Sequence, residues 1–336
     1  MIEARRRTEH SPATVDADFT RDVDPAAWLP KLAGIDAVIN AVGILRENGE
    51  QTFERVHARA PQALFAACVA AGIKRVVQIS ALGADRDGSA YFRSKRCADE
   101  YLAQLPLDWT IVQPSLVFGI GGASARLFAM LASLPIVPLP GGGRQQLQPI
   151  HIDDLVHAIA NLTQRRDFAR RRVALVGPEA TTLREFLTRL RRVLGLPRAY
   201  FLPIPASLMR VAATIAQLNS RSLLDRESLS MLEAGNTADP ADTGELLGRP
   251  PRPIEQFVAA DLRGLIAQHA QIEWLLHCCA GALQLSGYGR ASFRSGSTRA
   301  RTAWLCSPGP VSRELSPLSP CMQVPCWISC SALRPC

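Results

Sequence analysis

The sequence predicts an α/β fold built on a parallel sheet, followed by a small, mostly helical region and a disordered tail. Two observations carry this prediction. Short apolar runs alternate with helical stretches, most of them longer than about ten residues, up to Gly119, which is typical of parallel α/β sheets. After residue 276 neither a period of 2 nor one of 3.6 remains. We therefore expect three regions, residues 1–180, 181–276 and 277–336.

The expected strands are short apolar runs bounded by polar residues or glycine. They span residues 15–19, 37–42, 76–79, 109–112 and 173–176. The helices between them have apolar residues at helical spacing and span residues 25–32, 52–71 and 94–105. Gly34 and Gly72 follow two of these helices, as glycine commonly does at a helix end.

The pattern changes after Gly119. Helices are predicted at residues 126–134, 150–161 and 183–194, a loop at 135–148, and a smaller helical region at 203–266 with a polar loop at 235–253. The helix at 183–194 carries Arg184, Arg189, Arg191 and Arg192. A solvated basic face is the expectation, with acidic lipid headgroups or an acidic partner as the alternative.

Charge and cysteine are concentrated in the tail. Residues 277–336 contain six arginines and one acidic residue, which is five of the net eight positive charges, so nucleic-acid binding is not expected. Seven of the nine cysteines also lie there, without a second pair at zinc-finger spacing, so no metal site is expected. The chain has no signal-peptide pattern and no apolar run of about 18 residues, so a cytoplasmic protein without a transmembrane segment is expected.

Four motifs follow one another in the first region. They are Asn40-Ala41-Val42-Gly43 at one strand end, Ser80 at the next, Tyr91 with Lys95 on a helix, and Gln113–Gly119 after a further strand. In this order they resemble the atypical or extended short-chain dehydrogenases/reductases, NAD(P)-binding proteins of the NAD-dependent epimerase/dehydratase kind. They are similar in particular to the accessory dehydrogenase-like subunit of respiratory complex I.

The resemblance implies a Rossmann-type sheet that lacks its first β-α-β segment. The family's first strand, its glycine-rich turn, its first helix and its second strand should precede residue 13, and no such pattern is found. Because the first strand is central in the 3-2-1-4-5-6 order, the third strand should have no neighbour and the fourth an unpaired apolar edge. A late start codon and a frameshift near residue 277 would account for both ends, and truncation should weaken dinucleotide binding.

The resemblance also implies the roles of single residues. Lys95 would hold the nicotinamide ribose and Tyr91 would move a proton, because a nearby ammonium favours the phenolate. The expected cofactor contacts are Asp18, Phe19, Asn40, Ala41, Val42, Gly43, Ser80, Lys95, Pro114 and Ser115. The alternatives are a surface turn at Asp18, a plain strand end at Gly43, and a helix surface for the tyrosine and lysine.

Two further features bear on the chemistry. The hydroxyl position used by epimerases falls on Leu82, so Ser80 would line the nicotinamide pocket or cap its strand. His151 and Asp153 match a family element that fastens the substrate region to the sheet, and no third metal ligand accompanies them.

The expected function is therefore NAD(P) binding, with oxidoreductase or epimerase/dehydratase chemistry on an unknown small molecule, impaired by truncation. NAD and NADP are not distinguished, and whether the chain is an enzyme is left open. The alternative is a non-catalytic accessory or assembly factor of a membrane NADH–quinone redox system, peripheral to the inner membrane. An inactive pseudogene product is the third possibility.

Overall fold

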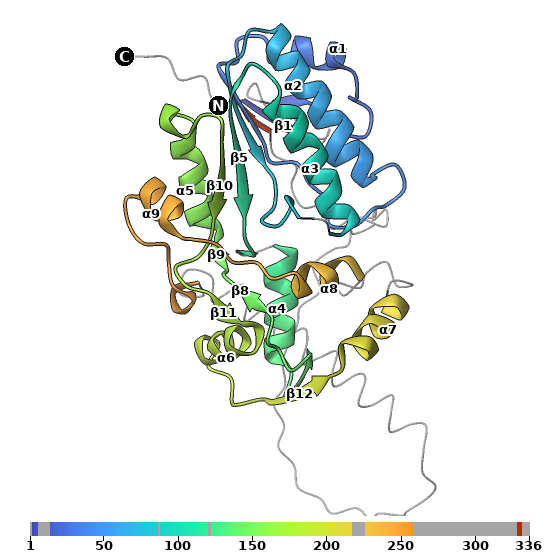
Figure 1. Ribbon diagram of the computed structural model, residues 1–336, viewed down its shortest axis with the longest axis vertical. Coiled ribbons are helices and arrows are strands. Elements are labelled where there is room, and N and C mark those ends of the chain that lie inside the picture. Colours follow the sequence, from blue (N-terminus) through green and yellow to red (C-terminus); the bar gives the residue numbers. More distant parts are fainter. Residues whose placement is uncertain are drawn as a thin grey trace, which may run out of the picture. The chain divides into compact units, whose positions relative to one another are not determined.

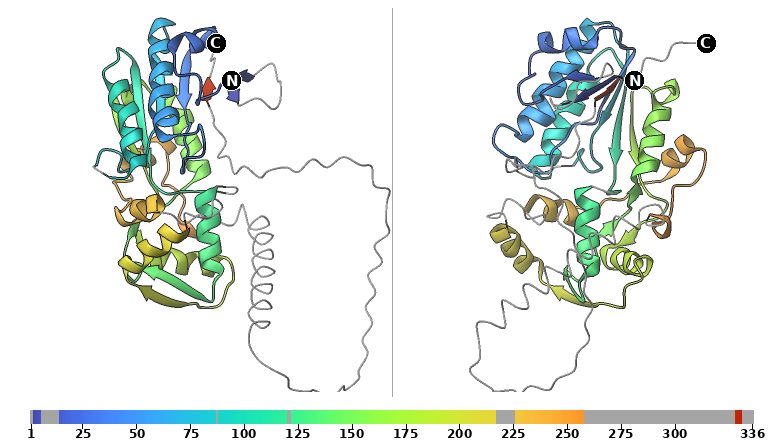
Figure 2. Two further views of the ribbon diagram at one scale, coloured as in Figure 1. Left: turned by 90° about the vertical axis from the view of Figure 1, so that its right-hand side faces the viewer. Right: turned by 180° about the vertical axis from the view of Figure 1, so that it is seen from behind.

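The computed structural model describes residues 2–5, 14–86, 88–119, 122–216, 226–257 and 328–330 (Figures 1 and 2). All of them belong to one of the chain's two compact units, which comprises residues 1–269 and 323–336. The region boundary expected at residue 276 lies outside the described residues.

A seven-stranded sheet forms the centre of this unit. Its order is β10 (Arg171–Leu175), β5 (Asp108–Pro114), β4 (Arg75–Ile79), β3 (Ala37–Asn40), β13 (Ile328–Cys330), β1 (Ile2–Arg5) and β2 (Thr14–Asp16). Strands β10, β5, β4 and β3 are mutually parallel, and β1 is parallel to β2. The predicted α/β fold with a parallel sheet is thus confirmed.

Strand β1 corrects the expectation for the start of the chain. In the 3-2-1-4-5-6 order it occupies the second position, because it lies parallel to β2 with Glu3 opposite Thr14. The prediction that the second strand is absent and that the third has no neighbour was therefore wrong. Four residues are too few to show a strand periodicity, so only the pairing reveals this strand.

Strand β13 occupies the first position and runs antiparallel to both neighbours. Ser329 lies opposite Ile39 on one side and Glu3 on the other. The edge of β3 is therefore paired, contrary to expectation, and three residues of the tail predicted to be disordered form a strand. Among the described residues no helix and no glycine-rich turn lie before β2, so the first β-α-β segment is represented there only by β1, its second strand.

Helices cover both faces of the sheet (Figure 1). One face carries α1 (Pro25–Trp28) with its 3-10 continuation (Leu29–Leu32), α2 (Ala60–Ala70) and α3 (Ala90–Ala103); the other carries α5 (Ile152–Leu162). Neighbouring strand residues alternate between these faces, since Val76 packs in the first core and Val77 in the second.

The predicted helix at residues 52–71 begins with a π-helical segment, Glu54–Arg59, in which the Ala60 N–H bonds to the Arg55 carbonyl. Pro61 explains this, because it has no N–H with which to continue the α-helical pattern. The shift in register turns His57 inward, where it is 1% exposed.

The segment after β5 builds a separate core beyond the carboxyl ends of β4 and β5. It comprises α4 (Ala123–Ser133), α6 (Leu183–Val193), the turn Ile254–Gln256 and three two-stranded pairs. These pairs are β6 (Val117–Phe118) with β9 (Ile150–His151), β7 (Ile136–Pro140) with β12 (Tyr200–Ile204), and β8 (Gln146–Leu147) with β11 (Thr181–Thr182). The loop predicted at 135–148 thus contains two strands, which become visible only through distant partners.

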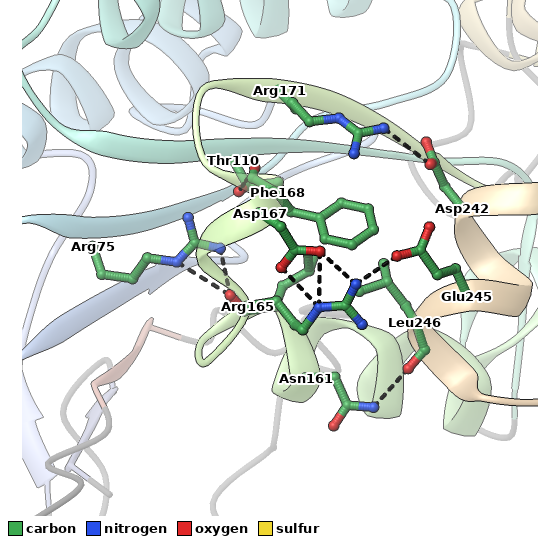
Figure 3. A network of polar contacts seen from close by, with 11 residues as sticks. Arg75, Thr110, Asn161, Arg165, Asp167, Phe168, Arg171, Asp242, Glu245 and Leu246 are labelled. Atoms are coloured by element: carbon green, nitrogen blue, oxygen red, sulfur yellow. Dashed lines mark hydrogen bonds and ion pairs between the residues drawn. The ribbon is translucent and has the colours of Figure 1, made fainter.

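Three further helices follow β12, namely α7 (Ala206–Ala216), α8 (Arg226–Glu233) and α9 (Ala241–Leu247). Figure 3 shows how α9 is joined to α5 and to the turn before β10, Arg166–Phe168. Arg165 binds Asp167 and Glu245, Arg171 binds Asp242 at 3.2 Å, and the Asn161 amide donates to the Leu246 carbonyl. The polar loop predicted at 235–253 therefore includes a helix that is held by ion pairs.

Candidate functional site

The side chain of Lys95 lies at the carboxyl ends of two neighbouring strands. It is 4% exposed, and its Nζ donates to the carbonyl oxygens of Val42 at 2.9 Å and Ile79 at 3.2 Å. A Cβ atom on Gly43 would lie 3.2 Å from this nitrogen, so the missing side chain leaves the backbone close to the ammonium. The structure therefore brings Val42, Gly43 and Lys95 together at the sheet edge where open α/β sheets bind ligands.

Asn40 shapes the turn that leads to Gly43. Its side chain is fully buried, donates to Gln78 Oε1 at 2.7 Å and accepts from the Val42 N–H at 3.2 Å. Because Gln78 is its partner on β4, the amide joins the two strand ends. Asn40 thus holds the backbone in place and presents no side-chain oxygen to a ligand.

His57 is a site residue that the sequence prediction missed. Its Nε2 accepts from the Ile44 N–H at 2.8 Å, and its Nδ1 lies 2.9 Å from Ser94 Oγ. Since the Ser94 hydroxyl donates to the Tyr91 carbonyl at 2.7 Å, the histidine must donate from Nδ1. Burial and the nearby Lys95 hold the pKa of His57 well below its ordinary value, which keeps the ring neutral.

This neutral ring fixes the residues after Gly43 against α3. Phe53 stacks on it with centroids 5.3 Å apart, and Tyr91 meets it edge-on at 5.2 Å. The available signal was its position in the apolar stripe of the predicted helix, four residues after Phe53 and three before Ala60.

Tyr91 lies among aromatic rings rather than at the ammonium. It is 9% exposed, and its ring contacts those of Phe53, His57 and Phe92. Burial raises the pKa of Tyr91 to about 12, and the charge of Asp99 adds to the effect. The spacing to Lys95 had suggested a lowered pKa; the pKa is raised instead because burial of the hydroxyl dominates.

Asp99 is a second residue that the sequence prediction missed. It is fully buried on α3, and the Ser80 hydroxyl donates to its Oδ2. Arg172 lies 4.0 Å from the same oxygen and 2.8 Å from Asp85, while Oδ1 has no hydrogen-bond partner among the described residues. Its position four residues after Lys95, inside an inward apolar stripe, was the available signal.

The Asp99 contact defines what Ser80 can do. A hydroxyl has one proton, and that of Ser80 is directed to the carboxylate. Ser80 therefore offers only lone pairs toward the sheet edge and does not donate to a substrate oxygen. Burial raises the pKa of Asp99 to about 6, although Ser80, Lys95 and Arg172 all act to lower it.

We expect Asp99→Asn to remove a pH dependence of stability. The pKa of Asp99 lies near 6 in the folded chain and near 3.8 when unfolded, so its stabilising effect is complete below about pH 4 and is lost as the pH rises through 6. The loss amounts to at most about 3 kcal/mol, because one pKa unit corresponds to about 1.4 kcal/mol. Urea unfolding between about pH 4.5 and 7.5 should show that the free energy of unfolding of the variant rises relative to that of the native chain as the pH increases.

Asp85→Asn is the matched control, since Asp85 contacts the same Arg172 but is 51% exposed. Because the charge of Asp85 makes the smallest contribution to the raised pKa of Asp99, this variant should keep most of the native pH profile. His57, whose lowered pKa acts in the opposite direction, is common to all three proteins and cancels in the differences. Parallel profiles for native chain and Asp99→Asn would contradict the assignment.

The remaining predicted contacts lie apart from this group. The Asp18 carboxylate accepts from the Thr20 N–H at 2.9 Å, and the Phe19 ring is buried against Trp28 with centroids 5.0 Å apart. The hydroxyl of Ser115 donates to the Gln148 carbonyl at 2.5 Å, and Pro114 accepts from the Leu82 N–H. These contacts hold turns and strands, and the adenine and carboxamide roles stay predictions.

His151 and its neighbours fasten the later elements, as the resemblance implied. His151 Nδ1 accepts from the Asp153 N–H at 3.2 Å at the start of α5. Arg252 binds Asp153 at 2.8 Å, and Arg249 binds Asp154 at 2.6 Å. The buried Asp154, rather than His151 alone, therefore holds the segment around residue 252.

The described residues contain no group of three or more His, Cys, Asp or Glu side chains placed to hold a metal ion. None of their helices combines the length and the apolar character needed to cross a bilayer.

The residues present fit one end of a dinucleotide. A buried ammonium beside a glycine backbone suits a ribose hydroxyl, which accepts a charge-assisted hydrogen bond. The pyrophosphate end would need backbone N–H groups at a glycine-rich helix start, and the described residues provide none next to β3.

Comparisons with known proteins agree with this geometry. Residues 4–118 match a family described as NAD(P)H-binding. Alpha subcomplex subunit 9 of mitochondrial NADH dehydrogenase [ubiquinone] 1 from Rattus norvegicus is 29% identical over 172 residues, 51% of this chain and 45% of that protein. The mitochondrial NADH-ubiquinone oxidoreductase 40 kDa subunit of Neurospora crassa is 24% identical over 181 residues, 52% of this chain and 48% of the subunit. The chain thus spans about half the length of these relatives.

Experimental structures share the fold at low identity. A nucleoside-diphosphate-sugar epimerase from Staphylococcus aureus superposes with a TM-score of 0.59 at 14% identity, covering 73% of this chain and 83% of the epimerase. An NADPH-dependent quinone oxidoreductase from Escherichia coli, complexed with NADPH, gives 0.58 at 18% identity, covering 74% and 83%. The Rossmann-like fold and the cofactor class expected from the sequence, NAD or NADP, are both supported.

Proposed function

We propose that this chain binds a nicotinamide dinucleotide at the carboxyl ends of β3 and β4. The proposal starts from the match of residues 4–118 to a family described as NAD(P)H-binding. The observation that carries the proposal is the buried ammonium of Lys95 beside Gly43. Lys95 would hold the nicotinamide ribose, Gly43 would admit it to the backbone, and His57 and Asn40 would keep that backbone in place. When bound, the dinucleotide would supply a hydride donor or acceptor.

Binding without proton transfer is the role that this geometry favours. Tyr91 has a pKa of about 12, and Ser80 directs its only proton to Asp99, so neither is prepared to exchange a proton with a substrate oxygen. The rat and Neurospora relatives are named as subunits of NADH dehydrogenase and NADH-ubiquinone oxidoreductase. We infer an accessory or assembly role in a membrane redox system of that kind, with the chain peripheral to the membrane.

An oxidoreductase or epimerase acting on a small molecule is the second candidate. It is favoured by Tyr91 and Lys95 lying on one helix, four residues apart, as they do in the family that the sequence resembles. Turnover of a quinone or sugar nucleotide that is lost in Tyr91→Phe would establish this candidate. Dinucleotide binding that is unchanged in the same variant, without turnover, would support the accessory role.

We further expect the chain to prefer NADPH over NADH by at least about tenfold. Strand β1 holds the second position of the sheet and ends at Arg5, which Arg6 and Arg7 follow in the sequence. The carboxyl end of the second strand approaches the adenosine ribose in this fold, where arginine accommodates the 2′-phosphate of NADP. A charged hydrogen bond of about 1.5–3 kcal/mol gives a preference of this size.

Fluorescence titration of the full chain with NADPH and NADH tests both proposals. Replacing Arg5, Arg6 and Arg7 together by alanine should bring the NADPH affinity to that of NADH. Arg166→Ala, an exposed arginine in the turn before β10, should change neither affinity. Equal binding of the two dinucleotides would refute the preference alone, whereas no binding of either would refute the proposed function.

A further inference from the structure

Exposed apolar side chains gather on β7, β12 and α7. Of the ten large hydrophobic side chains exposed among the described residues, five lie on these elements. We call them the β12–α7 face: Ile136 (56% exposed), Tyr200 (67%), Leu202 (41%), Leu208 (60%) and Val211 (57%). Such a group is more than the scattered exposure that ordinary surfaces show.

The backbone arrangement places these side chains on outward surfaces. Tyr200 pairs with Ile136 across the two strands, and Leu202, two residues on, projects to the same side. The alternate residues Val137 and Phe201 belong to the core beneath. One side of this small sheet is therefore packed and the other is bare.

Helix α7 follows β12 after a single residue, Pro205 (Figure 1). Ala213 on this helix is fully buried, while Leu208 and Val211, three residues apart, face outward. The sheet and the helix, which follow one another directly in the chain, thus each carry exposed apolar side chains.

The part of the chain that carries most of this face is basic. From Phe186 to Leu224 the sequence contains no aspartate or glutamate. Arg192, Arg198 and Arg210 are exposed within the described part of this stretch. Exposed arginines beside an apolar face complement an anionic surface.

The expected basic face of α6 is smaller than the sequence predicted. Arg191 is 5% exposed and donates to the carbonyls of Ala132, Leu134 and Pro197. Arg189 is paired with Glu179 and with Glu185. Two of the four arginines of α6 are thus bound to groups of the chain itself. Exposed arginines outside α6 are Arg198, just before β12, and Arg210 on α7.

We propose that the β12–α7 face docks on an anionic lipid surface. Leucine, isoleucine and valine enter the boundary between headgroups and acyl chains, tyrosine suits the interface, and arginines bind the phosphates. The proposal does not depend on dinucleotide binding, because it concerns a different part of the chain from Lys95 and Gly43.

Sedimentation of the full chain with lipid vesicles tests the docking. Vesicles containing about one third phosphatidylglycerol in phosphatidylcholine should bind the chain at least about tenfold more tightly than phosphatidylcholine alone, and added salt should weaken the binding. The double variant Leu208→Glu/Val211→Glu should lose at least about tenfold in affinity, because each carboxylate would enter an apolar, anionic interface.

Val156→Glu is the matched control, since Val156 is 54% exposed on α5, away from the face. It should bind vesicles like the native chain, and circular dichroism checks that both variants are folded. Equal binding to neutral vesicles, no binding, or equal loss in the control would overturn the proposal. If the native chain is a dimer that does not bind vesicles, and the double variant is a monomer, the face binds a second copy of the chain instead.

Discussion

Lys95→Met is expected to lower the affinity for NADPH about 10- to 100-fold, the equivalent of a charged hydrogen bond of about 1.5–3 kcal/mol, and to reduce the free energy of unfolding by about 2–4 kcal/mol. The affinity falls because a charge-assisted hydrogen bond to the ribose is lost and no other described cation lies at the Gly43 backbone. The stability falls because the carbonyls of Val42 and Ile79 lose a buried donor, and each unsatisfied group costs about 1–3 kcal/mol.

Fluorescence titration and urea unfolding measure the two effects separately. Tyr91→Phe is the matched control, since it lies one turn earlier on α3, is similarly buried and loses only a hydroxyl. Its NADPH affinity should stay within about twofold of the native value, because no described contact links that hydroxyl to the sheet edge. Native affinity in a folded Lys95→Met protein would place the cofactor elsewhere and refute the proposed site.

Ser329→Pro is expected to destabilise the chain by about 3 kcal/mol and to promote aggregation. Ser329 is the middle residue of β13, opposite Ile39 on β3 and Glu3 on β1. Proline has no N–H for the ladder and is poorly tolerated in an interior strand. Loss of β13 would expose the edge of β3, whose four residues are all buried, and such an edge pairs with other chains.

The measurement is the soluble fraction after concentration, together with urea unfolding of the soluble protein. Ser319→Pro, ten residues earlier in the tail and outside β13, is the control and should behave like the native chain. If Ser329→Pro unfolds at the native urea concentration, β13 does not stabilise the sheet, and the edge of β3 must be covered in another way.

The parallel centre of the sheet could be predicted from the sequence because each of its elements carries its own signal. The strands β3, β4 and β5 are buried on both faces, so each appears as a short apolar run, and α2 and α3 have helical periodicity. Asn40, Gly43, Ser80 and Lys95 occur at strand ends or on a helix start in family order, which led to the NAD(P)-binding class now supported by the family match.

Other features depended on contacts between distant residues. Strands β1 and β13 have four and three residues, too few for a period, and they exist only through pairing with each other, with β2 and with β3. The pKa of Tyr91 depends on burial among rings contributed by another helix, so the spacing of Tyr91 and Lys95 suggested the wrong direction.

The sequence by itself therefore determined the class of fold and the succession of its central strands and helices, and it led to the proposed dinucleotide site at their carboxyl ends. Only the tertiary structure decided which side chains remain available there. It directs the Ser80 proton to Asp99 and the Lys95 ammonium to two carbonyls, and it keeps His57 neutral. The physical reason is that desolvation and hydrogen-bond partners are properties of the packed surroundings, which local periodicity does not contain.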